Sequence, residues 1–543
     1  MAQQKGPSFD ADANPKPLQA LEQLEDIAPA QAQDEERTII QELLHVKPLF
    51  PRLFIIYVCV VSIGVDNGLA GLTLGIPSFR RQFGSFLNED AGYVVPANYT
   101  SAWAGASVGM QTIGAMLSGY LADKIGRRWC LRISAIIVVI AAAMMIAARH
   151  IGLLITSKGI LGLGTGFLVA QSAPYLAECS TPRLRGMAII GINAFLVFGQ
   201  WLGALLIWAA AENFPDVQDN TAWLLVFGLQ FIFPIAFLVL SVWLPESPIY
   251  LVQRGRIEEA NASARKLFGE NYDYQGHVAK AVLEVQAENE QVDHESISFW
   301  EPCRKTDLRR TLIGILVIVG QILTGNLFIL AYQNYFYELA KIPGSNALTV
   351  GSYSVSIVAN ICSYFVIESV GRRPLYTYGT LILGLSNFLV GFMDLLQGSE
   401  PQKAGAVAVF GLYLWSFTYQ ATVGPVAWAV AGEIPSNRLR AKTNSWINLV
   451  NSLASFGLSF AIPQLFNPDA LNLGLKMGYI FGAASMVLFV LAWLFLPETK
   501  NRTSWELDRL FEAHISAGKF KETKFDEFSM VDQNTDGKGH TNA

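Results

Sequence analysis

The sequence predicts an all-α membrane protein with twelve transmembrane helices, arranged as two parallel six-helix repeats with a small cytoplasmic helical insert. Three observations support this fold class. Only 15% of the 543 residues are charged, whereas soluble globular proteins average about 25%. Mean hydropathy is +0.34, and apolar runs long enough to cross the roughly 30 Å hydrocarbon core of a bilayer recur along the chain. Three short polar signatures also occur twice in the same order, which indicates two related halves.

The composition also excludes several classes of protein. The net charge of −5 gives no sign of nucleic-acid binding. The five cysteines are scattered without metal-ligand spacing, and the six histidines likewise suggest no metal. The sequence contains no P-loop and no nucleophile–base motif, so we expect neither an enzyme nor a cofactor. No apolar core follows a basic start near the N-terminus, so we expect the first span to act as an uncleaved membrane signal.

The apolar runs divide the chain into five parts. Residues 1–50 are polar and acidic and are predicted to be a disordered cytoplasmic N-terminus. Residues 51–245 hold six runs and residues 310–497 another six, and each set predicts a six-helix bundle. Residues 246–309 are charged with helical patterning, which predicts a cytoplasmic helical linker, and residues 498–543 form a cytoplasmic tail. The predicted spans are 53–76, 100–122, 129–148, 151–176, 186–211, 222–244, 310–337, 346–370, 374–396, 405–431, 441–466 and 473–496.

Lysine and arginine in the short loops set the predicted orientation. They concentrate in the loops after the second, fourth, eighth and tenth spans, which places these loops, both termini and the linker in the cytoplasm. The first loop on the other side, with Arg80 and Arg81, goes against this trend. Asn98 begins an Asn-Tyr-Thr sequon on the outer side and is a candidate glycosylation site. Such a short sequon also arises by chance, so an unmodified asparagine is the alternative.

The internal repeat joins three pairs of signatures that lie roughly 250 residues apart. The pairs are DKIGRR (123–128) with ESVGRR (368–373), ECSTPRLRG (178–186) with EIPSNRLRA (433–441), and PESP (245–248) with PETK (497–500). Two halves related in this way, in parallel orientation, place a binding site between them near the middle of the membrane.

The repeated signatures place acids and arginines together at the cytoplasmic ends of helices. We expect Glu178 with Arg185, Glu433 with Arg440, and the two GRR clusters (126–128 and 371–373) to form ion-pair networks that hold the halves together when the cavity opens outward. The simpler interpretation is positive-inside topology with solvated charges. Recurrence in both halves favours a cytoplasmic gate, whose candidates are Arg127, Arg128, Glu178, Arg185, Arg372, Arg373, Glu433 and Arg440.

One carboxylate, Asp66, lies near the middle of the first apolar run, where an ionised side chain costs on the order of 3 kcal/mol. We therefore expect Asp66 to face a polar cavity inside the bundle, and a hydrogen bond to a neighbouring helix is the alternative. Lys158 lies near the start of the fourth run, from which it could snorkel outward. If Lys158 reaches Asp66 instead, the two form a proton-linked switch, because the lysine holds the acid ionised and protonation releases the pair.

Nine segments resemble, in order, the sugar porter family of the major facilitator superfamily. They are GVDNG, LADKIGRR, KGILGLGTG, ECSTPRLRG, PESP, VGRR, GPVAW, EIPSNRLR and PETKNR, and they cover roughly residues 50–520. The segments GQILTGN, YQNYFYE and ELDRLFEAHISAGKF further resemble the fungal α-glucoside/hexose proton symporter branch. The resemblance implies twelve helices, alternating access and a sugar or polyol site between the halves. This chain departs from that branch at Ile63 and Asn448, where the branch usually has an acid and an arginine.

The resemblance also implies roles for single residues. The proton-coupling acid falls on Asp66 and its arginine partner on Lys158, whereas Gly320 replaces one glutamine of a family pair. Amides donate to and accept from hydroxyls, and an indole face stacks on the apolar face of a pyranose. An interhelical hydrogen bond is the alternative role for each amide. The implied substrate residues are Asn193, Gln321, Asn326, Trp428 and Asn451; Gln171, Gln200 and Tyr332 are further candidates.

Together these expectations describe a multi-pass plasma-membrane protein that transports a sugar or a similar polyhydroxy compound by alternating access, with proton symport. Its partners are then a small sugar or polyol, the proton and the lipid bilayer, without a nucleic acid. Two alternatives remain open. One is export of a sugar-derived or secondary metabolite by the same scaffold, and the other is a non-transporting nutrient sensor, which the short tail after Pro497 disfavours.

Overall fold

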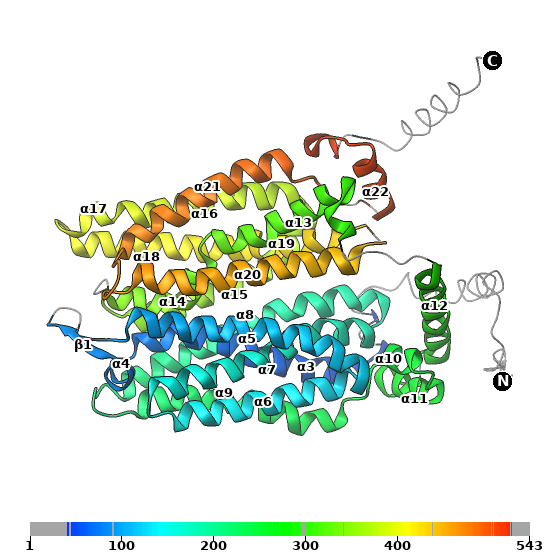
Figure 1. Cartoon of the computed structure of the whole chain (residues 1–543), viewed down its shortest axis with the longest axis horizontal. Coiled ribbons are helices and arrows are strands. Elements are labelled where there is room, and N and C mark those ends of the chain that lie inside the picture. The colour runs from blue at the N-terminus through cyan, green and yellow to red at the C-terminus, as the bar shows by residue number, and fades with distance from the viewer. Residues whose placement is uncertain are drawn as a thin grey trace, which may run out of the picture.

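The computed structural model describes residues 41–523, except 43–44, 90–91, 271, 295–299, 340–341, 437, 501, 503 and 522. The predicted disordered N-terminus up to residue 40 and the tail after residue 523 therefore lie outside the described residues. The described chain is built of helices and one two-stranded hairpin, and its long helices run roughly along one direction (Figure 1).

The first half of the molecule, from α3 to α9, contains six long helices. They are α3 (Leu49–Leu72), α5 (Ala97–Ile125), α6 (Arg127–Ala147), α7 (Ile151–Cys179), α8 (Pro182–Asn213) and α9 (Thr221–Leu240). The connection between α3 and α5 adds a short helix and an antiparallel hairpin in which Phe86 pairs with Tyr93. These elements are α4 (Pro77–Phe83), β1 (Ser85–Asn88) and β2 (Gly92–Val94).

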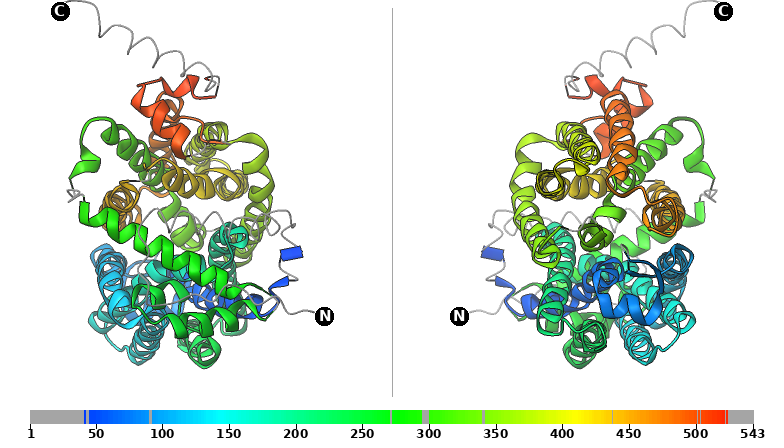
Figure 2. Two further views of the ribbon diagram at one scale, coloured as in Figure 1. Left: turned by 90° about the vertical axis from the view of Figure 1, so that its right-hand side faces the viewer. Right: turned by 90° about the vertical axis from the view of Figure 1, so that its left-hand side faces the viewer.

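The second half, from α13 to α21, repeats this plan with two of its long segments interrupted. Seen along the helices, the two halves form separate groups that face each other (Figure 2). Its helices are α13 (Lys305–Leu323), α14 (Asn326–Leu339), α15 (Ser345–Val370), α16 (Arg372–Phe392), α17 (Asp394–Gln397), α18 (Pro401–Thr418), α19 (Gly424–Glu433), α20 (Arg440–Phe466) and α21 (Met477–Phe495).

Four short or charged helices outside the long helical segments gather at one end of the molecule, which we call the inner end (Figure 1). The opposite end, with the hairpin and α17, is called the outer end. In the predicted linker, α11 carries Glu258 and Glu259 in its first turn and Arg265 and Lys266 in its last, which complements the helix dipole. The inner-end helices are α10 (Pro248–Gln253), α11 (Ile257–Phe268), α12 (Tyr274–His294) and α22 (Ser504–Glu512).

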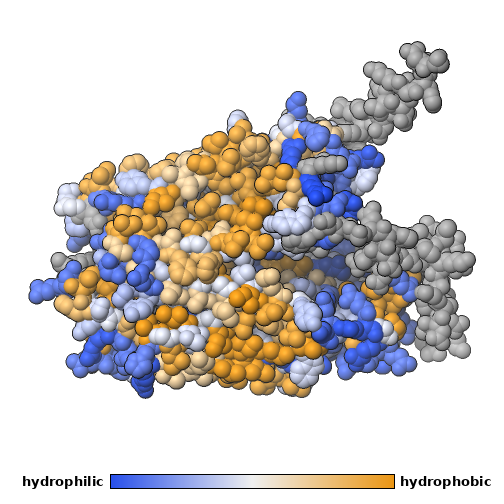
Figure 3. Space-filling model, in the orientation of Figure 1, coloured by the Kyte–Doolittle hydropathy of each residue, from blue (hydrophilic) through white to orange (hydrophobic). Residues whose placement is uncertain are grey.

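Among the described residues, eleven helical segments are long and apolar enough to cross a membrane. The surface agrees with this: on the face shown in Figure 3, an apolar band crosses the middle of the molecule, and hydrophilic residues gather toward both ends. A band of this kind is stable only in contact with lipid, because exposed apolar surface of this extent is rare on soluble proteins. The chain is therefore a multi-pass membrane protein.

The helix α5 occupies the position of the predicted second span but is less apolar than the other eleven segments. Its 29 residues include glycine and serine at positions where α7 crosses closely. A Cβ added to Gly114 of α5 would lie 2.3 Å from the Leu163 carbonyl oxygen of α7, and one added to Gly162 of α7 would lie 2.2 Å from the Ser107 carbonyl oxygen of α5. Close backbone contact of this kind is how small residues join membrane helices, and it explains the low hydropathy of α5.

Two irregularities interrupt the second half. At Gly325 the chain has φ +97°, a conformation that favours glycine, and this residue separates α13 from α14. The carbonyl of Thr324, exposed by the break, accepts hydrogen bonds from the side chains of Asn387 and Trp415 at 3.0 and 3.2 Å. Residues 419–423 form a π-helical turn just before Pro425, which lacks an N–H to continue the α-helical pattern.

Candidate functional site

A cavity of about 360 Å³ lies between the two halves. Its walls come from α3, α5, α7 and α8 of the first half, and from α13, α14, the π turn, α19 and α20 of the second. This volume falls in the range of about 300–1,000 Å³ typical of small-molecule sites. Eight of the residues that the sequence singled out line it: Asp66, Lys158, Asn193, Gln200, Gln321, Asn326, Tyr332 and Trp428.

The two intramembrane charges, Asp66 and Lys158, form an ion pair at the wall of this cavity. Their side chains are only 5% and 2% exposed, so the lysine is turned inward and does not snorkel outward. Lys158 Nζ also lies 3.4 Å from the backbone oxygen of Asp66. The same carboxylate oxygen that binds Lys158, Asp66 Oδ1, also accepts a hydrogen bond from Gln230 Nε2 of α9 at 3.4 Å. The pair is thus desolvated but partnered, as buried charges must be.

Tyr419, in the first position of the π turn, connects two of the predicted amides. Its hydroxyl accepts a hydrogen bond from Asn326 Nδ2 at 2.8 Å and donates to Gln321 Oε1 at 3.2 Å. The ring stacks on Trp415 with the centroids 4.9 Å apart. Because Asn326 begins α14 directly after the break at Gly325, both irregularities of the second half serve to bring these polar groups to the cavity.

Two amide oxygens at the cavity have no donor among the described residues. They are Gln200 Oε1 and Asn326 Oδ1, and both atoms are buried. Buried acceptors are nearly always satisfied by protein, water or ligand donors, so these atoms call for a hydroxyl or a water. Trp428, in contrast, is 54% exposed and also lines the cavity.

Two of the predicted substrate residues do not line the cavity. Gln171 donates from Nε2 to Ser118 Oγ at 3.2 Å, which is the interhelical hydrogen bond given above as the alternative role. Asn451 also lies outside the cavity lining, with its buried Oδ1 lacking a donor among the described residues. Several polar residues that line the cavity were not predicted from the sequence, and the low hydropathy of α5 and the proline after the π turn were the available signals for them. They are Asn67, Ser107, Gln111, Tyr419, Gln420, Ser455 and Ser459.

At the inner end of the first half, Glu178 pairs with an arginine of the GRR cluster and not with the arginine of its own signature. Glu178 pairs with Arg127 at 3.3 Å and accepts a hydrogen bond from Ser247, so its partner is not the expected Arg185. Arg185 instead lines a second cavity near the linker. The backbone N–H of Arg128 donates to the Glu246 carboxylate at 3.1 Å.

The same arrangement recurs at the inner end of the second half. Glu433 pairs with Arg372 at 3.1 Å, and the hydroxyl of Thr499 donates to it. The backbone N–H groups of Arg372 and Arg373 donate to the Glu498 carboxylate at 3.0 and 3.3 Å. Arg440, the expected partner of Glu433, begins α20. Each of these contacts joins elements of one half.

Hydrogen bonds between the two halves gather at the outer end. Ser101 Oγ donates to the Phe460 carbonyl at 2.9 Å. Gln464 Nε2 donates to Asn98 Oδ1 at 2.9 Å. Asn98, the predicted glycosylation site, is exposed in the first turn of α5, so its side chain is accessible although one of its atoms is engaged.

Comparison with known proteins agrees with this geometry. Residues 53–511 match the family described as sugar (and other) transporter. Over 475 residues the chain is 27% identical to MFS transporter fmqE of Aspergillus fumigatus, covering 86% of each protein. It is 26% identical to maltose permease MAL31 of Saccharomyces cerevisiae, covering 86% of this chain and 76% of the permease. The inward open structure of the xylose transporter XylE from E. coli superposes with a TM-score of 0.69 at 22% identity, over 85% of this chain and 99% of XylE, which establishes a shared fold. Because the family match extends over most of the sequence, the chain belongs to the sugar (and other) transporter family.

Proposed function

We propose that this protein imports a sugar or a closely related polyhydroxy compound across the plasma membrane, coupled to protons and by alternating access. The observation that carries the proposal is the cavity between the halves, where amides from both halves lie beside the buried Asp66–Lys158 pair. The relatives that transport maltose and xylose support the same substrate class.

The architecture that goes with this proposal has twelve membrane spans in two parallel six-helix bundles. They are the eleven apolar segments together with α5, which is the second span along the chain. The bundles comprise residues 51–245 and 310–497, joined by the linker 246–309, and the inner end faces the cytoplasm together with both termini. Arginine-rich loops at the inner end support this orientation, because cytoplasmic loops carry the excess of lysine and arginine. Asn98 then lies outside the cell, where it can accept a glycan.

Hydroxyl recognition follows from the polar groups of the cavity. The unpaired oxygens of Gln200 and Asn326 accept hydrogen bonds from sugar hydroxyls, one from each half of the molecule. Tyr419 fixes the orientation of the Asn326 amide, so that its oxygen, and not its nitrogen, is presented to the ligand. Trp428 supplies an aromatic surface for the apolar face of the ring. A ligand held from both halves favours their closure around it.

Proton coupling uses the Asp66–Lys158 pair. Protonation of Asp66 removes the attraction to Lys158, so the carboxyl and the ammonium separate and α3 and α7 are free to rearrange. The energetics permit one proton per substrate: about 100-fold accumulation requires about 2.7 kcal/mol, and one charge crossing about 100 mV supplies about 2.3 kcal/mol. A pH gradient provides the remainder.

The contacts at the two ends support an inward-facing state. The outer end is held shut by hydrogen bonds between the halves, such as that from Ser101 to Phe460. We assign the inner acid–arginine clusters to the cytoplasmic gate, in which each cluster keeps the inner end of its own half together. The halves can then move as units about the cavity, which is the usual form of alternating access in transporters built from repeats.

Uptake into proteoliposomes tests the proposal directly. We expect labelled maltose, glucose, xylose or sorbitol to enter vesicles against a gradient when the outside is more acidic, and an uncoupler to abolish accumulation. Asn326→Leu is expected to lose most uptake, whereas Asn98→Gln, a matched amide change at the outer surface, retains it. Influx that only equilibrates the substrate and is unchanged by the uncoupler would contradict proton coupling. The absence of influx for every sugar and polyol would contradict sugar import.

A further inference from the structure

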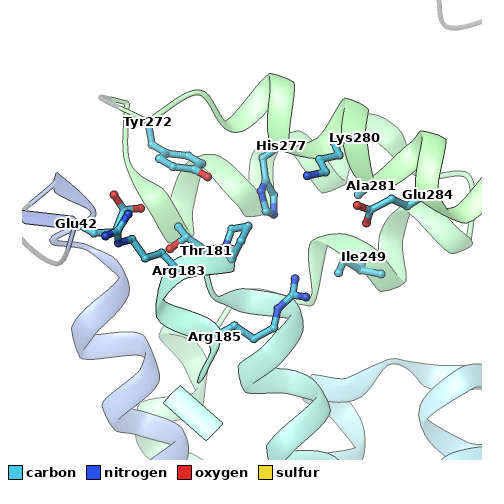
Figure 4. A pocket seen from close by; sticks show the side chains of 11 residues that line it. Glu42, Thr181, Arg183, Arg185, Ile249, Tyr272, His277, Lys280, Ala281 and Glu284 are labelled. Atoms are coloured by element: carbon cyan, nitrogen blue, oxygen red, sulfur yellow. The ribbon is translucent and has the colours of Figure 1, made fainter. Parts of the chain in front are cut away.

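A second cavity, of about 400 Å³, lies at the inner end between the start of α8 and the linker helices (Figure 4). Arg183 and Arg185 enter it from the first turn of α8. His277 and Lys280 enter it from the opposite side, three residues apart on one face of α12. The transport cavity uses none of these residues, so this site requires an explanation of its own.

The most informative residue is Thr181, which precedes α8. A threonine at this position ordinarily uses its hydroxyl to accept a hydrogen bond from the first turn of the helix. Here it makes no such bond: the residue is 1% exposed, lines the cavity, and its Oγ1 meets no partner among the described residues. A buried hydroxyl without a partner is costly, and a ligand in the cavity would satisfy it as an acceptor.

The charges around this hydroxyl define the kind of acceptor. Arg183, Arg185 and Lys280 bring three cationic side chains, opposed by the carboxylates of Glu42 and Glu284. The cations are therefore in excess, and the N-terminus of the 32-residue helix α8 adds the positive end of its dipole. The ring of Tyr272 closes one side of the cavity (Figure 4).

The state of His277 agrees with this excess. Burial, followed by the nearby charges of Arg185 and Lys280, lowers the pKa of His277 to about 4, although Asp273 acts in the opposite direction. The imidazole is accordingly neutral at pH 7, and it can donate one N–H without adding a further positive charge.

We propose that this cavity binds a phosphate-bearing anion, either a soluble phosphate compound or the phosphorylated headgroup of a membrane lipid. Phosphate oxygens accept from the Thr181 hydroxyl and from the arginine and lysine side chains, which approach from α8 and α12 on opposite sides. The bound anion joins the linker to the start of α8. The proposal is independent of the transported substrate, because it concerns a different cavity.

The test uses the full-length protein in nanodiscs of phosphatidylcholine. Binding of inorganic pyrophosphate, measured by isothermal titration calorimetry, tests whether the ligand is a soluble phosphate compound. Nanodiscs that contain phosphatidylinositol 4-phosphate, with bound lipid counted by native mass spectrometry, probe the headgroup. Pyrophosphate binding in plain nanodiscs supports a soluble ligand, and retention of the phosphorylated lipid without pyrophosphate binding supports a headgroup. If wild-type protein binds neither, the proposal is wrong.

Matched variants locate the binding. We expect Arg185→Gln and Lys280→Gln each to weaken binding by about tenfold or more, and Thr181→Val by about fivefold, since hydrogen bonds to charged groups exceed neutral ones. Lys266→Gln removes a cation from the exposed surface of α11, outside the cavity, and is expected to bind within about twofold of wild type. Thermal unfolding of each variant shows whether it is folded. Equal weakening in Lys280→Gln and Lys266→Gln would show nonspecific attraction and overturn the assignment.

Discussion

Replacing Asp66 by asparagine leaves the Lys158 ammonium buried at the cavity wall without its carboxylate. Lys158 is 2% exposed, and after the change its remaining recorded contact is the backbone oxygen of residue 66 at 3.4 Å. Removing one member of a buried ion pair typically costs about 3–5 kcal/mol, whereas replacing both members by uncharged residues is often close to neutral. We therefore expect Asp66→Asn to lower the free energy of unfolding by about 3 kcal/mol or more.

A double-mutant cycle combines Asp66→Asn with a second mutation, Lys158→Met, which roughly preserves the length of the side chain and removes its charge. Asp66→Asn and Lys158→Met together are expected to be more stable than either single variant, with a coupling energy of about 2–3 kcal/mol. Asp394→Asn is the matched control, because this carboxylate lies 3.8 Å from Lys476 at the outer end and is 26% exposed. Loss of so exposed an ion pair costs at most about 1 kcal/mol.

Two measurements are needed, because stability and coupling are different properties. Unfolding in detergent, followed by tryptophan fluorescence, gives the cycle energies. Proton-driven accumulation and counterflow exchange in proteoliposomes give the transport properties. The double variant is expected to regain stability and to exchange substrate, but not to accumulate it, since no group is left to carry the proton. If the stability changes of the two single variants add up to that of the double variant, the Asp66–Lys158 interaction is refuted. Accumulation of substrate by the double variant would refute the role of the pair in proton coupling.

Three further predictions concern other parts of the molecule. Tyr419→Phe removes the hydroxyl that links two cavity amides, so the KM for substrate uptake should rise about tenfold. The control Tyr378→Phe, at an exposed position on the outer surface of α16, should leave uptake kinetics unchanged. Gly325→Ala forces a residue with a side chain into φ +97° and places its Cβ 3.0 Å from the Phe481 ring, which should lower the free energy of unfolding by about 1–3 kcal/mol. The control Gly119→Ala, with open space around it, should leave stability unchanged or raise it. The pKa of His277 is about 4 in the folded protein and about 6.5 in the unfolded chain. Between these pH values only the unfolded chain binds the proton, so the free energy of unfolding falls as pH decreases from about 6.5 to about 4. His277→Asn should remove about 2–3 kcal/mol of that fall, measured by unfolding both proteins across this pH range.

The positions of the helices were predictable from the sequence because the bilayer imposes a length and a composition on each span. Eleven predicted spans correspond to apolar helical segments of the structure. The second expected span, α5, is the informative exception, since its glycines and serines serve close packing and its Gln111 faces the cavity. Hydropathy measures contact with lipid, so a helix used mainly for packing and for lining a cavity has a weak signal.

The composition of the cavity was predictable in part, and its internal contacts were not. A position in a repeat indicates which residues face the partner half, and eight candidates do line the cavity. The orientation of Gln171 toward Ser118, however, depends on the rotation of α7 against α5, which the sequence pattern does not determine. The bridge from Tyr419 to Asn326 joins residues 93 positions apart and requires both the break at Gly325 and the π turn. Contacts that depend on two distortions of helical geometry cannot be derived from ideal periodicity.

The inner clusters show how a repeat can indicate importance without indicating role. From the sequence, Glu178 and Glu433 were expected to pair with arginines of their own signature, but in the structure they pair across signatures, Glu178 with Arg127 and Glu433 with Arg372. The acids of the third signature, Glu246 and Glu498, bind backbone N–H groups at the starts of α6 and α16, where the helix dipole favours a negative charge. All three signatures therefore meet in one cluster in each half, and this explains why they recur together. Because the clusters tie helices of the same half, their first effect is to hold each inner end together, and opening of the inner end must occur between two such units.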